Sequence, residues 1–177
     1  MKKQGKQMII LLIVLVLLLG GYLGLRWYNE VQSTKTVEEE VDYIISLEEG
    51  SVIKYTFEYE GTEYTCEKKD DTWYYTGDPE LTLNQFYLTN IASKMEKIIA
   101  KDTISDVTDM EQYGLAKPTR TFSFETATER YEFYVGDSNS FTKMYYICKP
   151  GENTVYIVDA AVITSMNVDV KEIVVEE

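Results

Sequence analysis

The hydrophobic and polar positions of this chain follow three patterns in succession. Residues 8–25 form an unbroken apolar run with no charged side chain. The next stretch is polar and acidic, and beyond it apolar residues recur at short, regular intervals. These changes predict four segments: a basic tail at 1–7, a helix at 8–28, an acidic linker at 29–43 and a folded domain at 44–177.

The apolar run predicts a single membrane-spanning helix. About 20 apolar residues, each adding 1.5 Å, cross a hydrocarbon core of roughly 30 Å. Lys2, Lys3 and Lys6 precede the run, and basic residues beside a span stay in the cytoplasm. We therefore expect a single-pass protein of the cell membrane, with a cytoplasmic N-terminus and an extracytoplasmic C-terminal domain.

A cleaved signal peptide is the main alternative for the same residues. Its apolar core is typically 7 to 15 residues long and ends close to a cleavage site of small residues. Here the run is longer and the bulky Trp27 and Tyr28 follow it, so we favour a retained helix. Gly20 and Gly24 have the spacing that lets two spans approach closely, although glycines are also tolerated near helix ends in lipid.

Beyond the linker, alternating apolar and polar residues predict an antiparallel sheet. Tyr55, Phe57 and Tyr59 alternate with polar residues, and polar turns at Gly61 and at 68–71 lead to two further strand patterns. A period of two places one side of each strand in a core and the other side in solvent. The three strands therefore form a meander.

A helical period follows the meander. Apolar residues recur every three to four positions at Leu83, Tyr87, Ile91, Met95 and Ile98. This stripe predicts a helix with one face in the core. Thr82 and Gln85 have the spacing of a capping box, and Leu81 can pack on Phe86 as a hydrophobic staple. A weaker strand pattern then covers 98–107.

The first hairpin pattern of the domain recurs in the second half at a constant offset of 67 residues, and the offset grows by about ten residues after it. Phe122 and Phe124 occupy the positions of Tyr55 and Phe57, and the next strand keeps the same offset. We therefore expect an α+β fold of two similar units, each an antiparallel β-meander plus a helix. The units are expected at about 44–107 and 117–177.

The second unit is expected to contain an additional strand before its helix. Strand patterns at 144–148 and 155–158 are separated by a turn. Asp159 can cap a short helix that extends through Met166. A strand-like run at 171–175 follows.

Between the two units lies the motif Tyr113-Gly114-Leu115-x-x-Pro118. Gly114 can adopt a positive φ, and Pro118 fixes an extended entry into the next strand. Tyr113 and Leu115 would fill the junction between the units. A tight connection explains each of these residue types, so we favour a structural role for the motif, with a binding role as the alternative.

This motif follows a meander with a tryptophan and a helix, and it precedes a hairpin that ends in Val135-Gly136 and a late strand at Val155-Tyr156. In this arrangement the chain resembles the bacterial family known as domain of unknown function 4340, over about 44–177. The resemblance implies a membrane-anchored envelope protein. Some members are encoded with or near permease and auxiliary subunits of ATP-driven export systems of the gliding-motility type, which implies an accessory or scaffold role. It supplies no catalytic residue.

The charge distribution argues against polyanionic partners. All 30 acidic residues follow the apolar run, whereas four of the 17 basic residues precede it or lie at its edge, so the part beyond it has a formal charge of −17. Such a charge repels nucleic acid, other polyanions and anionic lipid. Proteins, neutral ligands and cations remain, and we expect other membrane or envelope proteins.

The sequence contains no histidine. This absence removes the usual general base of hydrolases and the commonest zinc ligand. No nucleophile motif takes its place, so we expect neither an enzyme nor a cofactor. Two alternatives remain: a hydrolase that uses carboxylates or a Ser/Lys pair, and a neutral-glycan or other ligand-binding module in which some of the 15 tyrosines stack on sugar rings.

Four acidic residues between the halves, Asp102, Asp106, Asp109 and Glu111, are candidate calcium ligands, because calcium prefers carboxylate oxygens. They lack the residue order of a calcium-binding loop, so we favour a solvated turn and expect no metal.

The two cysteines, Cys66 and Cys148, both lie in apolar strand patterns. We favour free thiols in the core, because small buried thiols are ordinary core residues. A disulfide is the alternative if the external compartment is oxidising.

Overall fold

The computed structural model of the chain describes residues 19–24, 26, 41–118 and 120–175, of which 19–24 and 26 are helical. Within these residues, no helix is long and apolar enough to cross a membrane. The predicted span at 8–28 and the predicted linker fall largely outside the described residues, so both stay predictions. The chain divides after residue 40 into two units, and the second unit has the fold described below.

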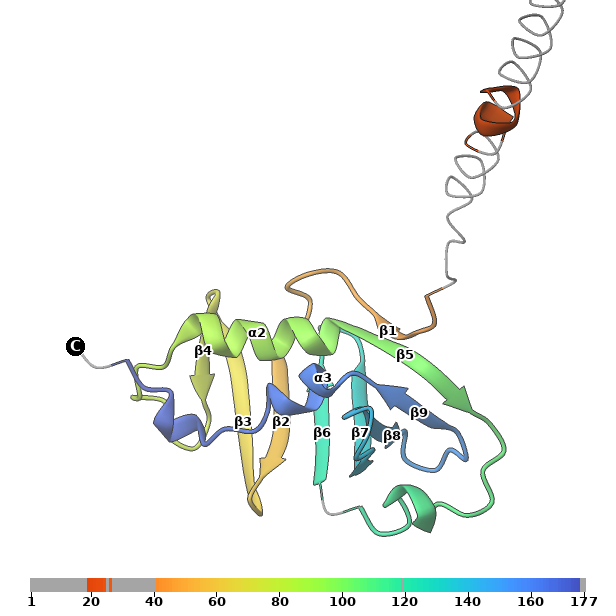
Figure 1. Cartoon of the computed structure of the whole chain (residues 1–177). Helices are drawn as coiled ribbons and strands as arrows, with labels where there is room; N and C mark the ends of the chain where they lie inside the picture. Colours follow the sequence, from red (N-terminus) through yellow and green to blue (C-terminus); the bar gives the residue numbers. More distant parts are fainter. Residues whose placement is uncertain (1–18, 25, 27–40, 119, 176–177) are drawn as a thin grey trace, which may run out of the picture. The chain divides into compact units, whose positions relative to one another are not determined.

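Nine strands among the described residues form one sheet (Figure 1). The strands are β1 (Tyr43–Ser46), β2 (Lys54–Tyr59), β3 (Thr62–Lys69), β4 (Thr72–Tyr75), β5 (Lys97–Ile104), β6 (Arg120–Glu125), β7 (Arg130–Ser138), β8 (Tyr145–Cys148) and β9 (Val155–Val158). Their order across the sheet is β1-β5-β9-β8-β7-β6-β2-β3-β4, and every neighbouring pair is antiparallel. The antiparallel α+β class that the alternation predicted is therefore confirmed.

Two helices, α2 (Gln85–Glu96) and α3 (Ala160–Thr164), cover one face of the sheet, and α2 runs across β4, β3, β2 and β6 (Figure 1). The core between the helices and the sheet contains a layer of fully buried aromatic side chains: Tyr55, Phe57, Phe122, Phe124 and Phe133. Phe122 stacks on Phe133 across β6 and β7, with ring centroids 5.1 Å apart. Burial of one such side chain stabilises the fold by about 1.5–3 kcal/mol, so this layer contributes substantially to stability.

The two halves of the domain exchange their last segments. A meander precedes a helix in each half, with β2-β3-β4 before α2 and β6-β7-β8-β9 before α3. The strand after α2, β5, pairs with β9 of the second half, and Val174 near the C-terminus bridges to Leu83, just before α2. Each half thus completes the other, and the result is one continuous sheet instead of two separate ones.

The predicted strand at 171–175 is wrong except for this single bridge. Residues Val170–Glu172 form a 3-10 turn, η2, which begins where the Asp169 side chain accepts a hydrogen bond from the Lys171 N–H at 2.8 Å. A cap of this kind favours a helical turn over an extended strand. The predicted cap at Asp159 is confirmed, because its side chain accepts from the Ala161 N–H at 2.8 Å.

The start of α2 also differs from the prediction. Asn84 is the N-cap, and its side-chain oxygen accepts a hydrogen bond from the Tyr87 N–H at 3.2 Å. Thr82 therefore does not cap the helix. The side chain of Phe86 is 84% exposed, so it forms no staple with Leu81. The capping box was wrong because an asparagine closer to the helix satisfies the same backbone donors.

Gln85 instead closes the outer edge of β4. Its Oε1 accepts a hydrogen bond from the Trp73 N–H at 2.7 Å, and its Nε2 donates to the Trp73 carbonyl at 3.0 Å. An edge strand leaves such backbone groups open to pairing with another chain. The Gln85 amide occupies both groups at Trp73, as a neighbouring strand would.

We expect Gln85→Leu to destabilise the protein by about 2 kcal/mol, because both backbone groups of the buried Trp73 would lose their partner. Urea unfolding followed by circular dichroism measures this loss. Gln112→Leu is the matched control, since the exposed Gln112 amide donates only one bond, to the Asp109 carbonyl, and a loss within about 0.5 kcal/mol is expected. Equal losses in the two variants would contradict a special role for Gln85.

The two cysteines are free and buried, as predicted. Cys66 lies on β3 and Cys148 on β8, and three strands separate β3 from β8 in the sheet. At about 4.8 Å per strand, their Cα atoms are roughly 19 Å apart, whereas a disulfide requires less than about 7 Å. Burial raises the pKa of the Cys66 thiol to about 11. Cys66 is therefore a neutral core thiol near physiological pH.

Candidate functional site

The motif Tyr113-Gly114-Leu115 lies at the end of the 3-10 turn η1 (Glu111–Tyr113), between β5 and β6. Gly114 has a φ of 70°, which confirms the predicted positive value. Its N–H donates to the Glu111 carbonyl at 3.0 Å, and the Leu115 N–H donates to the Met110 carbonyl at 3.0 Å. These bonds end the turn and direct the Leu115 side chain inward, where it is buried.

This turn lies against an irregularity in β7. The register between β7 and β8 changes from Val135 opposite Ile147 to Ser138 opposite Tyr145. One strand therefore has an extra residue, which is a β-bulge around Gly136 and Asp137.

The two backbones meet at this bulge without a side chain between them. A Cβ atom on Gly136 would lie 2.1 Å from the Tyr113 carbonyl oxygen, and a Cβ atom on Gly114 would lie 2.8 Å from the Asp137 backbone nitrogen. The structure thus brings into contact two segments that both carry the family resemblance, Tyr113-Gly114-Leu115 and Val135-Gly136. Pro118 lies farther along the same connection and is half-buried.

Side chains of the connection complete a small core on the sheet face opposite the helices. Leu115 and Val107 pack with Cys148 and Val155. Cys148 and Val155 alternate along their strands with residues that face the helices, so they point to the other face. The Tyr113 ring packs edge-on against Tyr146, with centroids 5.0 Å apart. The motif residues are therefore engaged in packing between the β5–β6 connection and the sheet.

The bulge leads into the hairpin at 139–144 that joins β7 to β8. The Asn139 Oδ1 atom accepts hydrogen bonds from the N–H groups of Phe141 and Thr142, at 2.9 and 3.0 Å. The Lys143 N–H donates to the Asn139 carbonyl, and the Asn139 N–H donates to the Met144 carbonyl, both at 2.8 Å. Four hydrogen bonds centred on one residue hold the hairpin in a defined shape.

The tip of this hairpin presents Phe141, whose side chain is 94% exposed. The Asn139 side-chain amide donates to the Tyr146 hydroxyl at 3.3 Å, and Tyr146 packs on Tyr113. A continuous set of contacts therefore links the motif to the hairpin tip. Sequence reasoning missed Phe141, because a single aromatic residue in a polar loop has no periodicity that would mark it.

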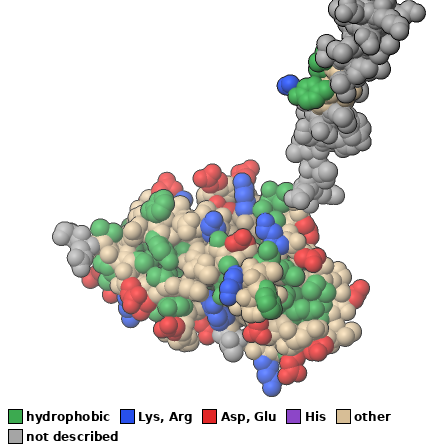
Figure 2. Space-filling model, viewed as in Figure 1, with side chains coloured by type: hydrophobic (Ala, Val, Ile, Leu, Met, Phe, Trp, Pro, Cys, Tyr) green, Lys and Arg blue, Asp and Glu red, His purple; other side chains and the backbone are tan. Residues whose placement is uncertain are grey.

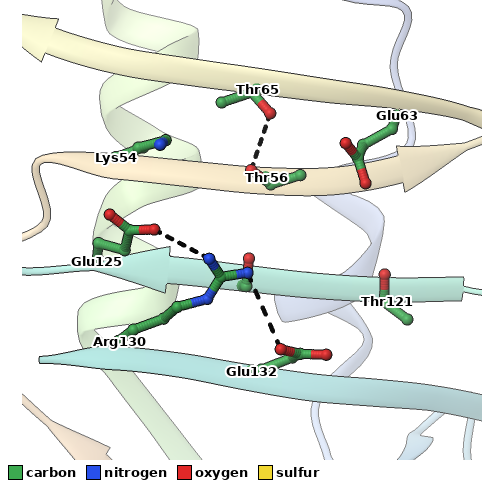
Figure 3. Close-up of a pocket in the computed structure, with 9 residues that line it drawn as sticks. Lys54, Thr56, Glu63, Thr65, Thr121, Glu125, Arg130 and Glu132 are labelled. Atoms are coloured by element: carbon green, nitrogen blue, oxygen red, sulfur yellow. Dashed lines mark hydrogen bonds and ion pairs between the residues drawn. The ribbon is translucent and has the colours of Figure 1, made fainter.

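A second candidate surface is the polar side of β2, β3, β6 and β7. Figure 3 shows this surface, where Arg130 lies between Glu125 and Glu132, with nitrogen–oxygen distances of 3.3 and 3.9 Å. The Thr56 and Thr65 hydroxyls are hydrogen-bonded at 2.9 Å. Together these strands line a hollow of about 270 Å³, formed by Lys54, Thr56, Glu63, Thr65, Thr121, Ser123, Glu125, Arg130 and Glu132.

The structure does not gather the candidate calcium ligands into a site. No group of three or more histidine, cysteine or acidic residues in the described ranges could hold a metal ion. The Asp102 carboxylate accepts a hydrogen bond from the Thr103 N–H, and the Asp109 carboxylate accepts one from the Glu111 N–H. Carboxylates used in this way stabilise the local turns.

The sequence model of the family described as domain of unknown function DUF4340 matches residues 73–177. Searches of curated proteins and of solved structures give no significant match. The matched stretch begins in β4, so it is shorter than the expected resemblance over 44–177. It includes the motif turn, the bulge and the hairpin, and it covers more than half of the chain. The chain therefore belongs to the DUF4340 family.

Proposed function

We propose that this chain is a membrane-anchored, extracytoplasmic accessory or scaffold protein, which works by association with another membrane or envelope protein. The predicted span at 8–28 would hold it at the membrane. The family resemblance suggests an ATP-driven export system of the gliding-motility type as its setting. The observation that carries the proposal is the exposed Phe141 on a hydrogen-bonded hairpin.

Phe141 has the properties of an anchor residue for a protein partner. Its 94% exposed ring adds nothing to the core of the free protein. Transfer of such a side chain into an apolar pocket is worth about 1.5–3 kcal/mol. Because hydrogen bonds already fix the hairpin, little conformational entropy would be lost on binding. Aromatic side chains in such positions dominate the energetics of many interfaces.

Phe141→Ser should reduce the recovery of the partner at least about tenfold, which corresponds to a loss of 1.4 kcal/mol in binding. The full chain would be crosslinked in its native cells and isolated, and the attached membrane proteins would be quantified by mass spectrometry. The melting temperature should not change, because Phe141 contributes nothing to the core.

Phe86→Ser is the matched control, because Phe86 is also exposed, at 84%, but lies at the start of α2. It should leave partner recovery unchanged. Recovery that is unaffected by Phe141→Ser, or that falls equally in both variants, would contradict the proposal.

A neutral-glycan-binding module is the second candidate function. The hydroxyl groups of Thr56, Thr65, Thr121 and Ser123 line the hollow on the polar sheet face and are suited to hydrogen bonds with a polyol. The described residues that line this hollow include no aromatic side chain. The exposed Tyr43 and Tyr74 lie on β1 and β4, at opposite edges of the sheet. Without a stacking ring beside the hydroxyls, we place association with a protein first.

A further inference from the structure

We propose that the polar side of β3, β2, β6 and β7 is a homodimer interface, and that its occupant is a second copy of this chain. This surface is distinct from the hairpin tip, and the inference does not depend on the proposed function. It is carried by the order of charges across the four strands, which is complementary to itself.

One row of side chains crosses all four strands. The register places Glu67 of β3 opposite Lys54 of β2, Lys54 opposite Glu125 of β6, and Glu125 opposite Arg130 of β7. All four residues alternate with core residues along their strands, so they share the face away from the helices. The charges along this row are negative, positive, negative and positive, at a spacing of about 4.8 Å.

A second copy can be placed on this face by a twofold axis that runs parallel to the strands, between β2 and β6. The row of one copy would then meet the same row of the second copy in the opposite order. Glu67 of one copy would then face Arg130 of the second copy, and Lys54 would face Glu125. The symmetry forms each of these pairs twice. Because both rows come from the same sheet, their spacings match.

The neighbouring row is compatible with the same axis. It consists of Thr65, Thr56, Ser123 and Glu132, in the order β3, β2, β6 and β7. The axis would bring Thr65 to Glu132, a pair that can form a hydrogen bond, and Thr56 to the buried Ser123, where no like charges meet. A twofold axis that runs along the row would instead place each charged residue against the same residue of the second copy, so that like charges would meet. The charge order therefore selects one arrangement of the two copies.

Two basic side chains on this face could still form ion pairs with a second chain. Lys54 takes part in none of the ion pairs within the described part of the chain. The Arg130 side chain is 60% exposed although it contacts two carboxylates. On the opposite, helix-bearing face, acidic and basic side chains are scattered (Figure 2). The ordered row thus distinguishes the polar sheet face.

The interface is expected to be weak and sensitive to salt. Four strands present roughly 400 Å² per copy, whereas stable interfaces bury about 800 Å² per partner. Exposed ion pairs contribute about 0–1 kcal/mol each. Gly20 and Gly24 are both helical, and no atom of the described residues lies within 4 Å of a Cβ added at either. In the predicted span, their spacing would let two helices approach closely. Such contacts would raise the effective concentration of the two faces.

Charge reversal in separate chains tests this arrangement. Lys54→Glu alone and Glu125→Lys alone each place like charges opposite one another twice, so each variant should dimerise at least about tenfold more weakly. The full chain, kept in a mild non-ionic detergent, would be measured by sedimentation equilibrium. An equimolar mixture of the two variants, carrying different tags, should recover a heterodimer with near-original affinity.

Formation of the heterodimer in the mixture shows whether Lys54 and Glu125 contact each other between copies. Lys54 and Glu125 are also neighbours within one chain, so each substitution alone changes intramolecular contacts, whereas restoration on mixing requires contact between copies. Lys143→Glu, an exposed reversal on the hairpin, should leave dimerisation unchanged and provides the matched control. A monomeric unsubstituted protein, a dimer insensitive to Lys54→Glu, or a mixture without heterodimer would overturn the inference.

Discussion

Gly136→Ala should destabilise the domain by about 3 kcal/mol, the largest effect that we expect from a single substitution. The added Cβ would lie 2.1 Å from the Tyr113 carbonyl oxygen and 2.9 Å from the Leu115 Cγ atom. The first of these is a backbone atom and cannot rotate away, so the motif turn and the bulge must separate. Urea or thermal unfolding followed by circular dichroism measures the loss.

Ser140→Ala, at an exposed position in the hairpin that follows the bulge, serves as the control for Gly136→Ala. It should change the free energy of unfolding by less than about 0.5 kcal/mol. If Gly136→Ala is tolerated as well as Ser140→Ala, the close contact between the turn and the bulge does not stabilise the protein.

Gly114→Val is expected to have the second largest effect, a loss of about 2–3 kcal/mol. The φ of 70° is strained for any residue with a branched Cβ, which costs about 1–3 kcal/mol. In addition, the new Cβ would lie 2.8 Å from the Asp137 backbone nitrogen. The substitution therefore combines backbone strain with a steric clash, and thermal unfolding measures the sum.

Gly151→Val separates these two contributions. Gly151 has a similar φ of 78°, but an added Cβ would meet no atom within 4 Å. It should therefore show only the strain, and its loss should be smaller than that of Gly114→Val. Equal losses would mean that the clash with Asp137 adds no cost beyond the backbone strain. An unchanged melting temperature of Gly114→Val with lost partner binding would instead show that the motif has a binding role.

The hairpin tip and the polar sheet face are proposed to bind different partners, so their contributions can be tested separately. Phe141→Ser should weaken association with the partner and leave the homodimer intact, whereas Lys54→Glu should weaken the homodimer. If one substitution abolishes both kinds of association, the two surfaces are coupled. Independent effects would support a scaffold that joins a second copy through one surface and a different protein through another.

The motif Tyr113-Gly114-Leu115 has one feature that the local sequence predicts and one that it does not. The positive φ of Gly114 was predictable, because only glycine adopts that conformation readily and a turn was required there. The contact with Gly136, 22 positions later, was not predictable from local pattern. It depends on a bulge in β7, and a bulge is a property of strand pairing that one strand does not encode.

The sequence by itself determined most of the strands and turns, and the side of each of these strands that enters the core; β1 and the turn at Val170–Glu172 were not predicted. Alternation with a period of two sets the faces, since successive side chains point in opposite directions. It also predicted a repeat, because Phe122 and Phe124 stand where Tyr55 and Phe57 stand in the first half. These are local properties of an extended chain.

Only the tertiary structure decided which strands are neighbours. An antiparallel strand with one apolar face can pair with many others, so the pattern did not show that β5 pairs with β9 or that Val174 returns to Leu83. Gln85 has a local spacing that fits a capping box, but its amide binds Trp73 across the fold. The alternating row from Glu67 to Arg130 exists only because three separate pairings align it. Register is set by packing and by turn geometry over the whole sheet, and that information lies between segments, not within any one of them.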